Sequence, residues 1–430
     1  MRRHRPRRRG RLMSEPTWDE CSAGRPVVSA GAVPTGDLQP RGPHDRVRPS
    51  MSPLGDSITW EDWLTGRAAD REEAGLVRRL HPRRPHETVL DLASNDYLGL
   101  SHHPQVRRAA AAAALRWGAG ATASRLVTGT LTLHTDLEAE LADWLGQPAA
   151  LVLSTGYHAN LAAVTALADR DAHIISDAHI HASLIDAVRL SSARLTVVPH
   201  NDVTAVRAAL TAHPGRRTLV LAESVYSVLG DRAPLVDLAD ACAGHGAWLL
   251  VDEAHALGVH GPGLVKACGL ADRPDVIVTA TLSKSLGSQG GAILGTTALI
   301  EHLINTARPF IFDTGLNPAA TAAALTATRI TRIHPQLAAT VHARVTALAG
   351  LLDVPAPAGA VLSVPMPSPS DALAAQAELL TGGVRVGCFR PPSVPDGISR
   401  LRITASAGMA PEDWQRATQA LHSVTRRARS

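Results

Sequence analysis

From Asp91 onward, short apolar runs alternate with longer segments in which apolar residues recur at helical spacing. This alternation is typical of β-strands joined by crossover helices around a largely parallel sheet. Segments such as 134–146 and 157–169 carry the helical pattern. The runs interpreted as strands cover residues 150–154, 173–176, 194–198, 218–223, 248–253, 275–280 and 291–295. We therefore expect an α/β fold with a mostly parallel seven-stranded sheet.

The sequence pattern changes after about Gly315. A long Ala-rich helical stretch and two Pro-rich segments lead to a smaller set of apolar runs and a closing amphipathic helix from Pro411. This order of elements predicts a smaller C-terminal α+β domain. The predicted divisions are an N-terminal arm over 51–95, a large ligand-binding domain over 96–315 and a small domain over 316–430.

The first 50 residues differ from the rest in composition. They are rich in Pro, Gly and charge, and they carry eleven Arg against five acidic residues, which leaves the rest of the chain slightly acidic. Arginine-rich arms are typical of nucleic-acid binding or twin-arginine export, but no apolar segment follows these arginines. We interpret residues 1–50 as a disordered basic tail or as sequence upstream of a true start at Met51. No nucleic-acid partner is expected. The least favoured alternative is a protein that binds nucleic acid through this arginine-rich segment.

Two further patterns bear on where the protein works. No run of 18 apolar residues is free of charge or helix breakers, so we expect no membrane span. The four cysteines, Cys21, Cys242, Cys268 and Cys388, are scattered and form no CxxC pair. This spacing favours neither a disulfide framework nor a thiolate zinc site, and it predicts a cytoplasmic protein.

Lysine usage singles out one position. Of the 43 basic residues, only Lys266 and Lys284 are Lys. A buried amine can lose its proton and form an imine with an aldehyde, whereas Arg stays protonated. Lys266 lies in an expected surface segment, and Lys284 follows a strand expected to be buried. Lys284 is therefore the candidate for covalent chemistry, although two residual lysines are also compatible with chance.

Polar residues follow the predicted strands where ligands bind in open α/β sheets, beyond the carboxyl ends. A phosphate dianion suits the helix that opens at Gly156 and Tyr157, and Thr281 offers a hydroxyl to the same group. An ionised Asp252 would keep a pyridine nitrogen protonated. Taken singly, each such residue is often only a cap, a turn or a satisfied polar group. Together they predict a site for pyridoxal 5′-phosphate (PLP).

The remaining strand-end residues fit the other parts of the same cofactor. The amine of Lys284 would hold the PLP aldehyde as a Schiff base. His255, Ser227 or both would bond the phenolic oxygen of the ring. The DEAH sequence at 252–255 is also a helicase signature, but the chain has no GxxxxGK[ST] loop. Neither GxGxxG, HExxH nor GxSxG is present either.

One histidine cluster suggests a zinc site as an alternative. His173, His179 and His181 lie close in sequence. His179 and His181 would share a face of an extended segment, but no third ligand lies at a standard spacing from this pair, so we expect no metal.

Several segments between about Glu73 and Leu421 resemble the α-oxoamine synthases. These are fold-type I PLP-dependent transferases that join an amino acid to an acyl thioester with loss of CO2. The matching segments are 90–104, 117–146, 176–187, 249–261, 281–295 and 386–407. Within the family, the chain is most similar to the branch that makes 8-amino-7-oxononanoate for biotin biosynthesis.

The resemblance implies roles for individual residues. It supports the cofactor set Gly156, Tyr157, Ser227, Asp252, His255, Thr281 and Lys284. His181 matches an imidazole that stacks on the cofactor ring and lies against the substrate. Arg390 matches the residue that takes the amino-acid carboxylate, and Ser393 matches a neighbouring substrate contact. Arg78 matches an arginine that meets the acyl substrate.

The resemblance also implies a reaction and an assembly. L-alanine and pimeloyl-CoA, or a pimeloyl carrier protein, would give 8-amino-7-oxononanoate, CO2 and the free thiol. Lys284 would act as the general base for the Cα proton. A homodimer with the site at the subunit interface is expected.

Three departures from the family pattern bear on substrate specificity. Leu229 stands where the family's SxDG motif has an acid, Ala256 stands in place of Gly after DEAH, and Ile180 precedes the HAS motif. A sister α-oxoamine synthase with another acyl-CoA or amino acid, such as a glycine C-acetyltransferase or a secondary-metabolite paralogue, is therefore kept as an alternative.

Overall fold

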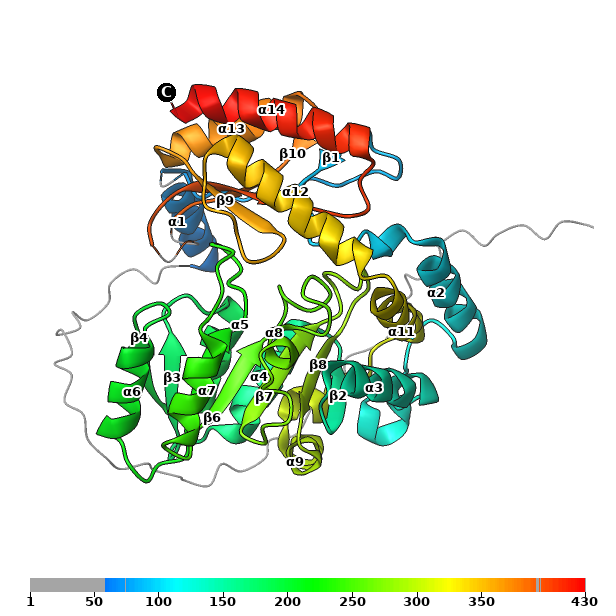
Figure 1. Cartoon of the computed structure of the whole chain (residues 1–430), viewed down its shortest axis with the longest axis vertical. Coiled ribbons are helices and arrows are strands. Elements are labelled where there is room, and N and C mark those ends of the chain that lie inside the picture. The colour runs from blue at the N-terminus through cyan, green and yellow to red at the C-terminus, as the bar shows by residue number, and fades with distance from the viewer. Residues whose placement is uncertain (1–58, 74, 392–393, 395, 430) are drawn as a thin grey trace, which may run out of the picture. The chain divides into compact units, whose positions relative to one another are not determined.

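A seven-stranded sheet forms the centre of the computed structural model, which describes residues 59–73, 75–391, 394 and 396–429. Its strand order is β2-β8-β7-β6-β5-β3-β4, and only β8 runs antiparallel to its neighbours. The strands are β2 (Ala149–Leu153), β3 (His173–Asp177), β4 (Arg194–Val198), β5 (Thr218–Glu223), β6 (Trp248–Asp252), β7 (Val276–Thr281) and β8 (Gly291–Gly295). The predicted mostly parallel sheet is confirmed (Figure 1).

The central strands bury both of their faces, which explains their continuous apolar runs. Along β5, Leu219 and Leu221 enter one hydrophobic cluster, whereas Val220 and Ala222 enter another. Each fully buried Leu or Val contributes roughly 1.5–3 kcal/mol through removal of its apolar surface from water. One cluster includes residues of α4 (Gly156–Leu167), α5 (Ala182–Ser191) and α9 (Thr297–Thr306). The other includes residues of α3 (Thr132–Leu145), α6 (Val203–Ala212) and α7 (Leu235–Ala243).

Two helices begin directly beyond the sheet and place residues of the site. Thr155 caps α4, because its hydroxyl accepts a hydrogen bond of 3.0 Å from the backbone N–H of His158. His181 caps α5 in the same way, its Nδ1 accepting from the N–H of Ser183 at 3.2 Å. The residue that precedes each helix thus caps its first turn and fixes where the helix begins.

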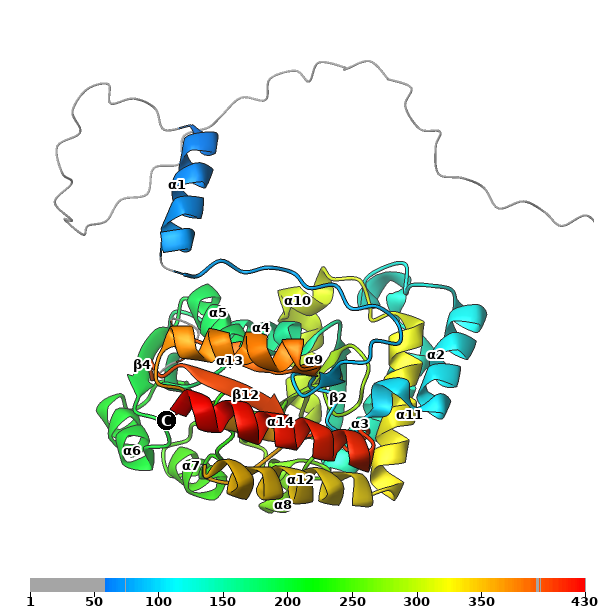
Figure 2. The same ribbon diagram turned by 90° about the horizontal axis from the view of Figure 1, so that it is seen from above.

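A second, antiparallel sheet follows in the C-terminal part, with the strand order β11-β12-β9. Figure 2 shows α12, α13 and α14 beside one another over β12. These elements are β9 (Val361–Pro365), β11 (Gly387–Phe389), β12 (Arg400–Thr404), α12 (Gln336–Leu352), α13 (Pro369–Thr381) and α14 (Pro411–Arg429). The predicted α+β character of this region is confirmed, and the domain boundary near 315 stays a prediction.

Shorter and peripheral elements complete the unit that spans Arg83–Ser430. β1 pairs in parallel with β10, and α11 packs on α2 and α3. These elements are β1 (Leu90–Asp91), β10 (Val384–Arg385), the 3-10 helix η1 (Leu100–His102), the π-helix η2 (Arg125–Gly129), α2 (Pro104–Trp117), α8 (Leu264–Ala267), α10 (Arg308–Ile311) and α11 (Pro318–Ile333).

The first unit, Met1–Pro82, contains one described helix, α1 (Trp60–Glu73), in which every described side chain is exposed. The interpretation of residues 1–50 as a tail lies outside the described residues. Among the helices that the structure does describe, none is long and apolar enough to cross a membrane.

Candidate active site

A cavity of about 230 Å³ lies at the carboxyl ends of β5, β6 and β7, beside the starts of α4 and α5. It brings together seven of the predicted cofactor and catalytic residues, which come from four separate segments of the chain. They are Gly156, Tyr157, His181, Asp252, His255, Thr281 and Lys284. The parallel strands thus place their polar ends at one edge of the sheet, as the sequence predicts.

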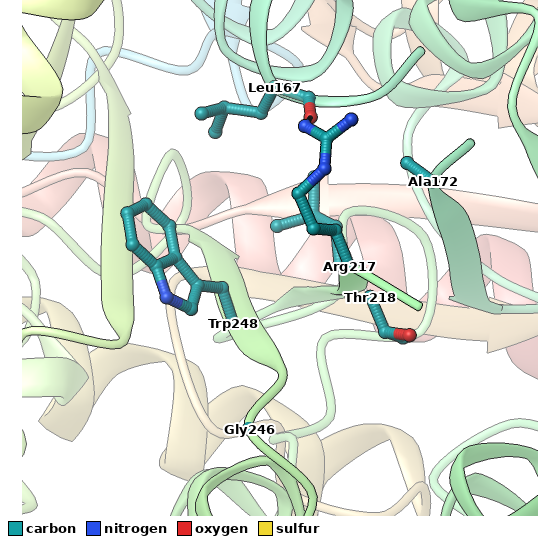
Figure 3. A pocket seen from close by; sticks show the side chains of 7 residues that line it. Leu167, Ala172, Arg217, Thr218, Gly246 and Trp248 are labelled. Atoms are coloured by element: carbon teal, nitrogen blue, oxygen red, sulfur yellow. Dashed lines mark hydrogen bonds between the residues drawn. The ribbon is translucent and has the colours of Figure 1, made fainter. Parts of the chain in front are cut away.

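A second cavity, of about 240 Å³, lies at the opposite edge, where β5 and β6 begin (Figure 3). Its wall includes Trp248 and Arg217, and the guanidinium of Arg217 is paired with Asp169 at 2.7 Å. The described side chains that line it include no carboxyl, imidazole, amine or thiol that could transfer a proton or bond covalently to a substrate. The first cavity is therefore the candidate active site.

Asp252 ends β6 with its carboxylate buried and oriented. Its Oδ2 accepts a hydrogen bond of 2.8 Å from Nδ2 of Asn160, and its Oδ1 accepts one of 2.9 Å from the backbone N–H of Ala254. The amide of Asn160 is itself held, because Thr279 donates to Oδ1 at 2.7 Å and Nδ2 also reaches Ser183 at 2.8 Å. The carboxylate is thus fixed at the wall of the cavity in an orientation set by three neighbouring polar side chains.

Lys284 projects into the cavity from the loop after β7. Its Nζ lies 2.9 Å from Nε2 of His255, and Nδ1 of His255 lies 2.8 Å from the hydroxyl of Tyr97. Burial lowers the pKa of Lys284, and although Asp252 and Glu223 favour the ammonium form, the pKa falls to about 8. Burial and the nearby Lys284 hold the pKa of His255 well below its usual range. A neutral imidazole therefore faces an amine that can give up its proton near neutral pH.

Glu223 adds a buried carboxyl to the same wall. It is 2 % exposed, and its Oε2 accepts a hydrogen bond of 3.1 Å from the backbone N–H of Ser227. Within the described part of the chain, Oε1 has no hydrogen-bond partner. Burial and the adjacent Asp252 raise the pKa of Glu223 well above its usual range. Burial thus shifts the protonation equilibrium of this carboxyl toward its neutral form, in which it can donate a hydrogen bond.

Gly156 and Thr281 form the end of the cavity that suits a phosphate. A Cβ at position 156 would lie 2.9 Å from Cβ of Thr281 and 3.1 Å from its hydroxyl, so only Gly fits there. The first N–H groups of α4 have no intrahelical acceptor, and the positive end of the helix dipole favours an anion. Thr281 shares its hydroxyl with Ser283 at 2.7 Å. Tyr157 donates its own hydroxyl to Asp186.

His181 lies at the mouth of the cavity. Its Nδ1 is 2.8 Å from the hydroxyl of Ser183 and also caps α5, so the ring is held by two contacts at one nitrogen. Burial lowers the pKa of His181, with Lys284 adding to the effect and Asp252 opposing it. A neutral imidazole at this point can stack on a planar ring.

The other predicted residues lie apart from the lining. Ser227 contributes its backbone, since its N–H bonds Glu223 and its carbonyl accepts a hydrogen bond of 2.9 Å from Nε of Arg402. Arg390 directly follows β11 and is half-buried, outside the cavity lining. Arg78 belongs to the Met1–Pro82 unit. Ser393 lies outside the described residues.

The cavity fits PLP on the chemistry of its donors. The start of α4 at Gly156 offers backbone N–H groups to a phosphate, and Asp252 is buried with an orientation set by Asn160. An amine with a lowered pKa and a buried carboxyl with an unpartnered oxygen face the same space. These are groups that a charged pyridine aldehyde would satisfy.

Comparison with known proteins agrees with this geometry. The family model for class I and II aminotransferases matches residues 87–421. An 8-amino-7-oxononanoate synthase of Mycolicibacterium gilvum is 52 % identical over 388 residues, which are 89 % of this chain and all of that protein. The chain belongs to the class I and II aminotransferase family. The predicted resemblance to the α-oxoamine synthases is thereby confirmed.

Solved structures show the same fold. Serine palmitoyltransferase of S. paucimobilis, described with PLP bound, has a TM-score of 0.80 and 29 % identity and covers 87 % of this chain and 99 % of its own. The 8-amino-7-oxononanoate synthase of Francisella tularensis has a TM-score of 0.67 and 25 % identity over 78 % of this chain and 97 % of its own. The prediction of a fold-type I PLP-dependent transferase is confirmed.

Proposed function

We propose that the chain condenses L-alanine with a pimeloyl thioester, with loss of CO2 and of the thiol, to give 8-amino-7-oxononanoate in biotin biosynthesis. The observation that carries this proposal is the convergence of Lys284, Asp252 and His255 in one cavity of a chain 52 % identical to 8-amino-7-oxononanoate synthase of Mycolicibacterium gilvum. PLP is the proposed cofactor. The proposed acyl donor is pimeloyl-CoA or a pimeloyl carrier protein.

Each part of PLP has a candidate holder in the cavity. The N–H groups at Gly156 and Tyr157, with the hydroxyl of Thr281, would hold the phosphate. Asp252 would hold the proton on the pyridine nitrogen. When bound, PLP supplies an electron sink for a carbanion at the substrate Cα. His255, Ser227 or both would hold the ring oxygen.

Lys284 carries the proton transfer in this proposal. Its amine would hold the cofactor aldehyde until the amino acid arrives, and would then be free to take the proton from the alanine Cα. With a pKa of about 8, a useful fraction of the amine is unprotonated near neutral pH. His181 would lie over the cofactor ring and against the substrate. Because Nδ1 accepts a hydrogen bond from the N–H of Ser183, the neutral ring carries its proton on Nε2, which is able to donate a hydrogen bond.

The substrate residues are proposed on sequence matches. Arg390 would take the alanine carboxylate, which suits the bidentate geometry of a guanidinium, and Ser393 would lie beside it. Arg78 would meet the acyl substrate. A cytoplasmic location and the absence of a nucleic-acid partner stay predictions.

We also propose a homodimer. Leu126 and Val127 on η2 are 53 % and 74 % exposed, and Phe312 is 69 % exposed. Their segments are joined by the β-bridge between Ser124 and Thr314. Apolar side chains gathered on one surface are typical of a protein interface, and a second copy of the chain is the occupant that the family resemblance implies.

A substrate panel tests the proposed reaction. Purified full-length enzyme with PLP is incubated with alanine, glycine or serine and with acetyl-, succinyl- or pimeloyl-CoA. Mass spectrometry identifies and quantifies the product of each pair. Alanine with pimeloyl-CoA should give the largest kcat/KM. Serine with a long-chain acyl-CoA belongs in the panel as well, because the higher TM-scores are those of serine palmitoyltransferases. A larger kcat/KM for any other pair would replace the proposed substrates.

A further inference from the structure

A chain of hydrogen bonds runs from the cavity amine to the C-terminal sheet. Nζ of Lys284 meets Nε2 of His255 at 2.9 Å, and Nδ1 of that ring meets the hydroxyl of Tyr97 at 2.8 Å. The Tyr97 hydroxyl reaches Oδ1 of Asn95 at 3.0 Å, and both terminal nitrogens of Arg402, on β12, reach the same Oδ1 at 3.3 Å. Tyr97 is fully buried and His255 is 3 % exposed, so water does not compete for these contacts.

The direction of each hydrogen bond follows from the inventory of donors. The guanidinium of Arg402 can only donate, so the Asn95 atom that it meets is the carbonyl oxygen. That oxygen can only accept, so the Tyr97 hydroxyl donates its proton to Asn95. The hydroxyl then has only lone pairs left for His255, and Nδ1 must carry the ring proton. Nε2 is therefore unprotonated where it faces Lys284.

We propose that Tyr97 is a positioning residue for the active-site amine, because its hydroxyl fixes His255 as the Nδ1–H tautomer and turns an unprotonated Nε2 toward Lys284. Tyr97 acts through His255. This inference rests on the proposed function, in which Lys284 holds the cofactor. The SNDY segment at 94–97 thus helps to set the protonation state of Lys284, which lies far along the chain.

Several charged groups bear on the same amine and stay in place when the Tyr97 hydroxyl is removed. Asp252 and Glu223 favour the ammonium form of Lys284, and Arg402 opposes it. In Tyr97→Phe, Nδ1 of His255 loses its acceptor, so the ring proton moves to Nε2. A donor then faces Nζ and stabilises the neutral amine. The pKa of Lys284 should fall further, a direction that loss of packing alone does not predict.

The presence of only two lysines makes the test direct. The full-length chain, freed of cofactor, is pulsed with acetic anhydride between pH 6 and 10, and mass spectrometry follows acetylation of Lys284 and Lys266. In Tyr97→Phe the labelling midpoint of Lys284 should fall by about half a unit to one unit, which is about a three- to tenfold rise in the ratio of neutral to charged amine. The midpoint of Lys266 should stay the same.

Two further variants complete the design. Tyr226→Phe is the matched control, since Tyr226 is equally buried but packs on His200, with 4.4 Å between the ring centroids. Asn95→Leu should lower the midpoint as Tyr97→Phe does, because the freed hydroxyl then donates to Nδ1. An unchanged midpoint in Tyr97→Phe, or an equal shift in Tyr226→Phe, would overturn the proposal. Added PLP should protect Lys284 in the wild type, and failure of protection alone would count against the proposed function instead.

Discussion

The two lysines of the chain lie in contrasting surroundings. Nζ of Lys266 donates a hydrogen bond of 2.7 Å to the carbonyl oxygen of Trp144, in the last turn of α3, where a positive charge also suits the helix dipole. Nζ of Lys284 faces His255 inside the cavity. Lys266 therefore performs a capping role that a guanidinium can also fill, whereas the proposed role of Lys284 needs an amine that loses its proton.

This contrast predicts the effect of replacing each lysine by arginine. Lys284→Arg keeps the charge but cannot form the imine, so turnover should fall by about 10³-fold or more. The absorbance band of the lysine-bound cofactor, which lies at the edge of the visible range, should disappear. Lys266→Arg is the matched control and should keep both the turnover and the absorbance band of the wild type. Retention of the absorbance band in Lys284→Arg would exclude Lys284 as the attachment site.

The sequence predicted those site residues that directly follow strands. Asp252 and Lys284 stand at the ends of apolar runs, and a parallel sheet brings such ends together whatever lies between them. Asn160 and Tyr97 were not predicted, because their contacts span 92 and 158 residues of sequence. The helical period does indicate Asn160 in one respect, since it lies one turn after Gly156 on α4.

At the scale of elements, the seven strands of the large sheet were predicted to within one residue, and for the central strands this is because burial on both faces requires continuous apolar runs. The π-helix η2 could not be found in this way. It is held by tertiary contacts, since Arg125 is buried in an ion pair with Glu138 at 2.9 Å and also reaches the carbonyl of Val152 at 3.1 Å. The spacing of apolar residues along the sequence does not depend on such distant contacts and therefore cannot predict them.

The loops after β3, β4 and β5 are joined by one imidazole. His200, after β4, lies 2.9 Å from Oδ1 of Asp177 and 2.7 Å from Oδ2 of Asp231. Burial opposes the charged ring, but the hydrogen bonds to both carboxylates outweigh it and raise the pKa of His200 to about 9. His200 thus links the segment that leads to His181 with the turn that follows Ser227.

The raised pKa predicts a pH-dependent stability. Because the folded pKa lies above the unfolded value of about 6.5, the contribution of His200 is fully present below pH 6.5 and is lost as the pH rises through 9. His200→Gln should lower the free energy of unfolding by about 1–3 kcal/mol at pH 6 and by much less at pH 9.5. Urea denaturation at the two pH values measures the difference.

An exposed histidine provides the control for this measurement. The ring of His302 bonds the carbonyl of Ala166 at 3.0 Å instead of a carboxylate. His302→Gln should therefore change stability by a similar small amount at both pH values. An equally large loss at pH 6 and pH 9.5 in His200→Gln would show that packing, not charge, is the contribution of His200.

At the scale of the whole molecule, the proposed dimer surface adjoins the active site. Asp313, next to the exposed Phe312, accepts a hydrogen bond from Ser154, which directly precedes the cap of α4. A charged side chain in an apolar interface costs several kcal/mol when it is left unpaired. Val127→Asp should therefore shift the protein from dimer to monomer, as measured by light scattering, and should lower turnover. Leu115→Asp, at a 90 % exposed position on α2, is the control and should change neither the oligomeric state nor the turnover. A wild-type chain that is monomeric throughout would contradict the proposal.

The last prediction concerns how much of the chain the reaction needs. The family model begins at residue 87, and 388 aligned residues of this chain account for the whole of the Mycolicibacterium gilvum relative. Every described residue to which the proposals give a role in the site lies between Arg78 and Arg402. A chain that starts at Met51 should therefore keep the kcat, the KM and the melting temperature of the full chain. Because residues 1–50 carry eleven arginines, both chains should be assayed at low and moderate salt, where an electrostatic contribution from that segment would differ. A large loss of kcat on truncation at both salt concentrations would show that residues 1–50 take part in the reaction.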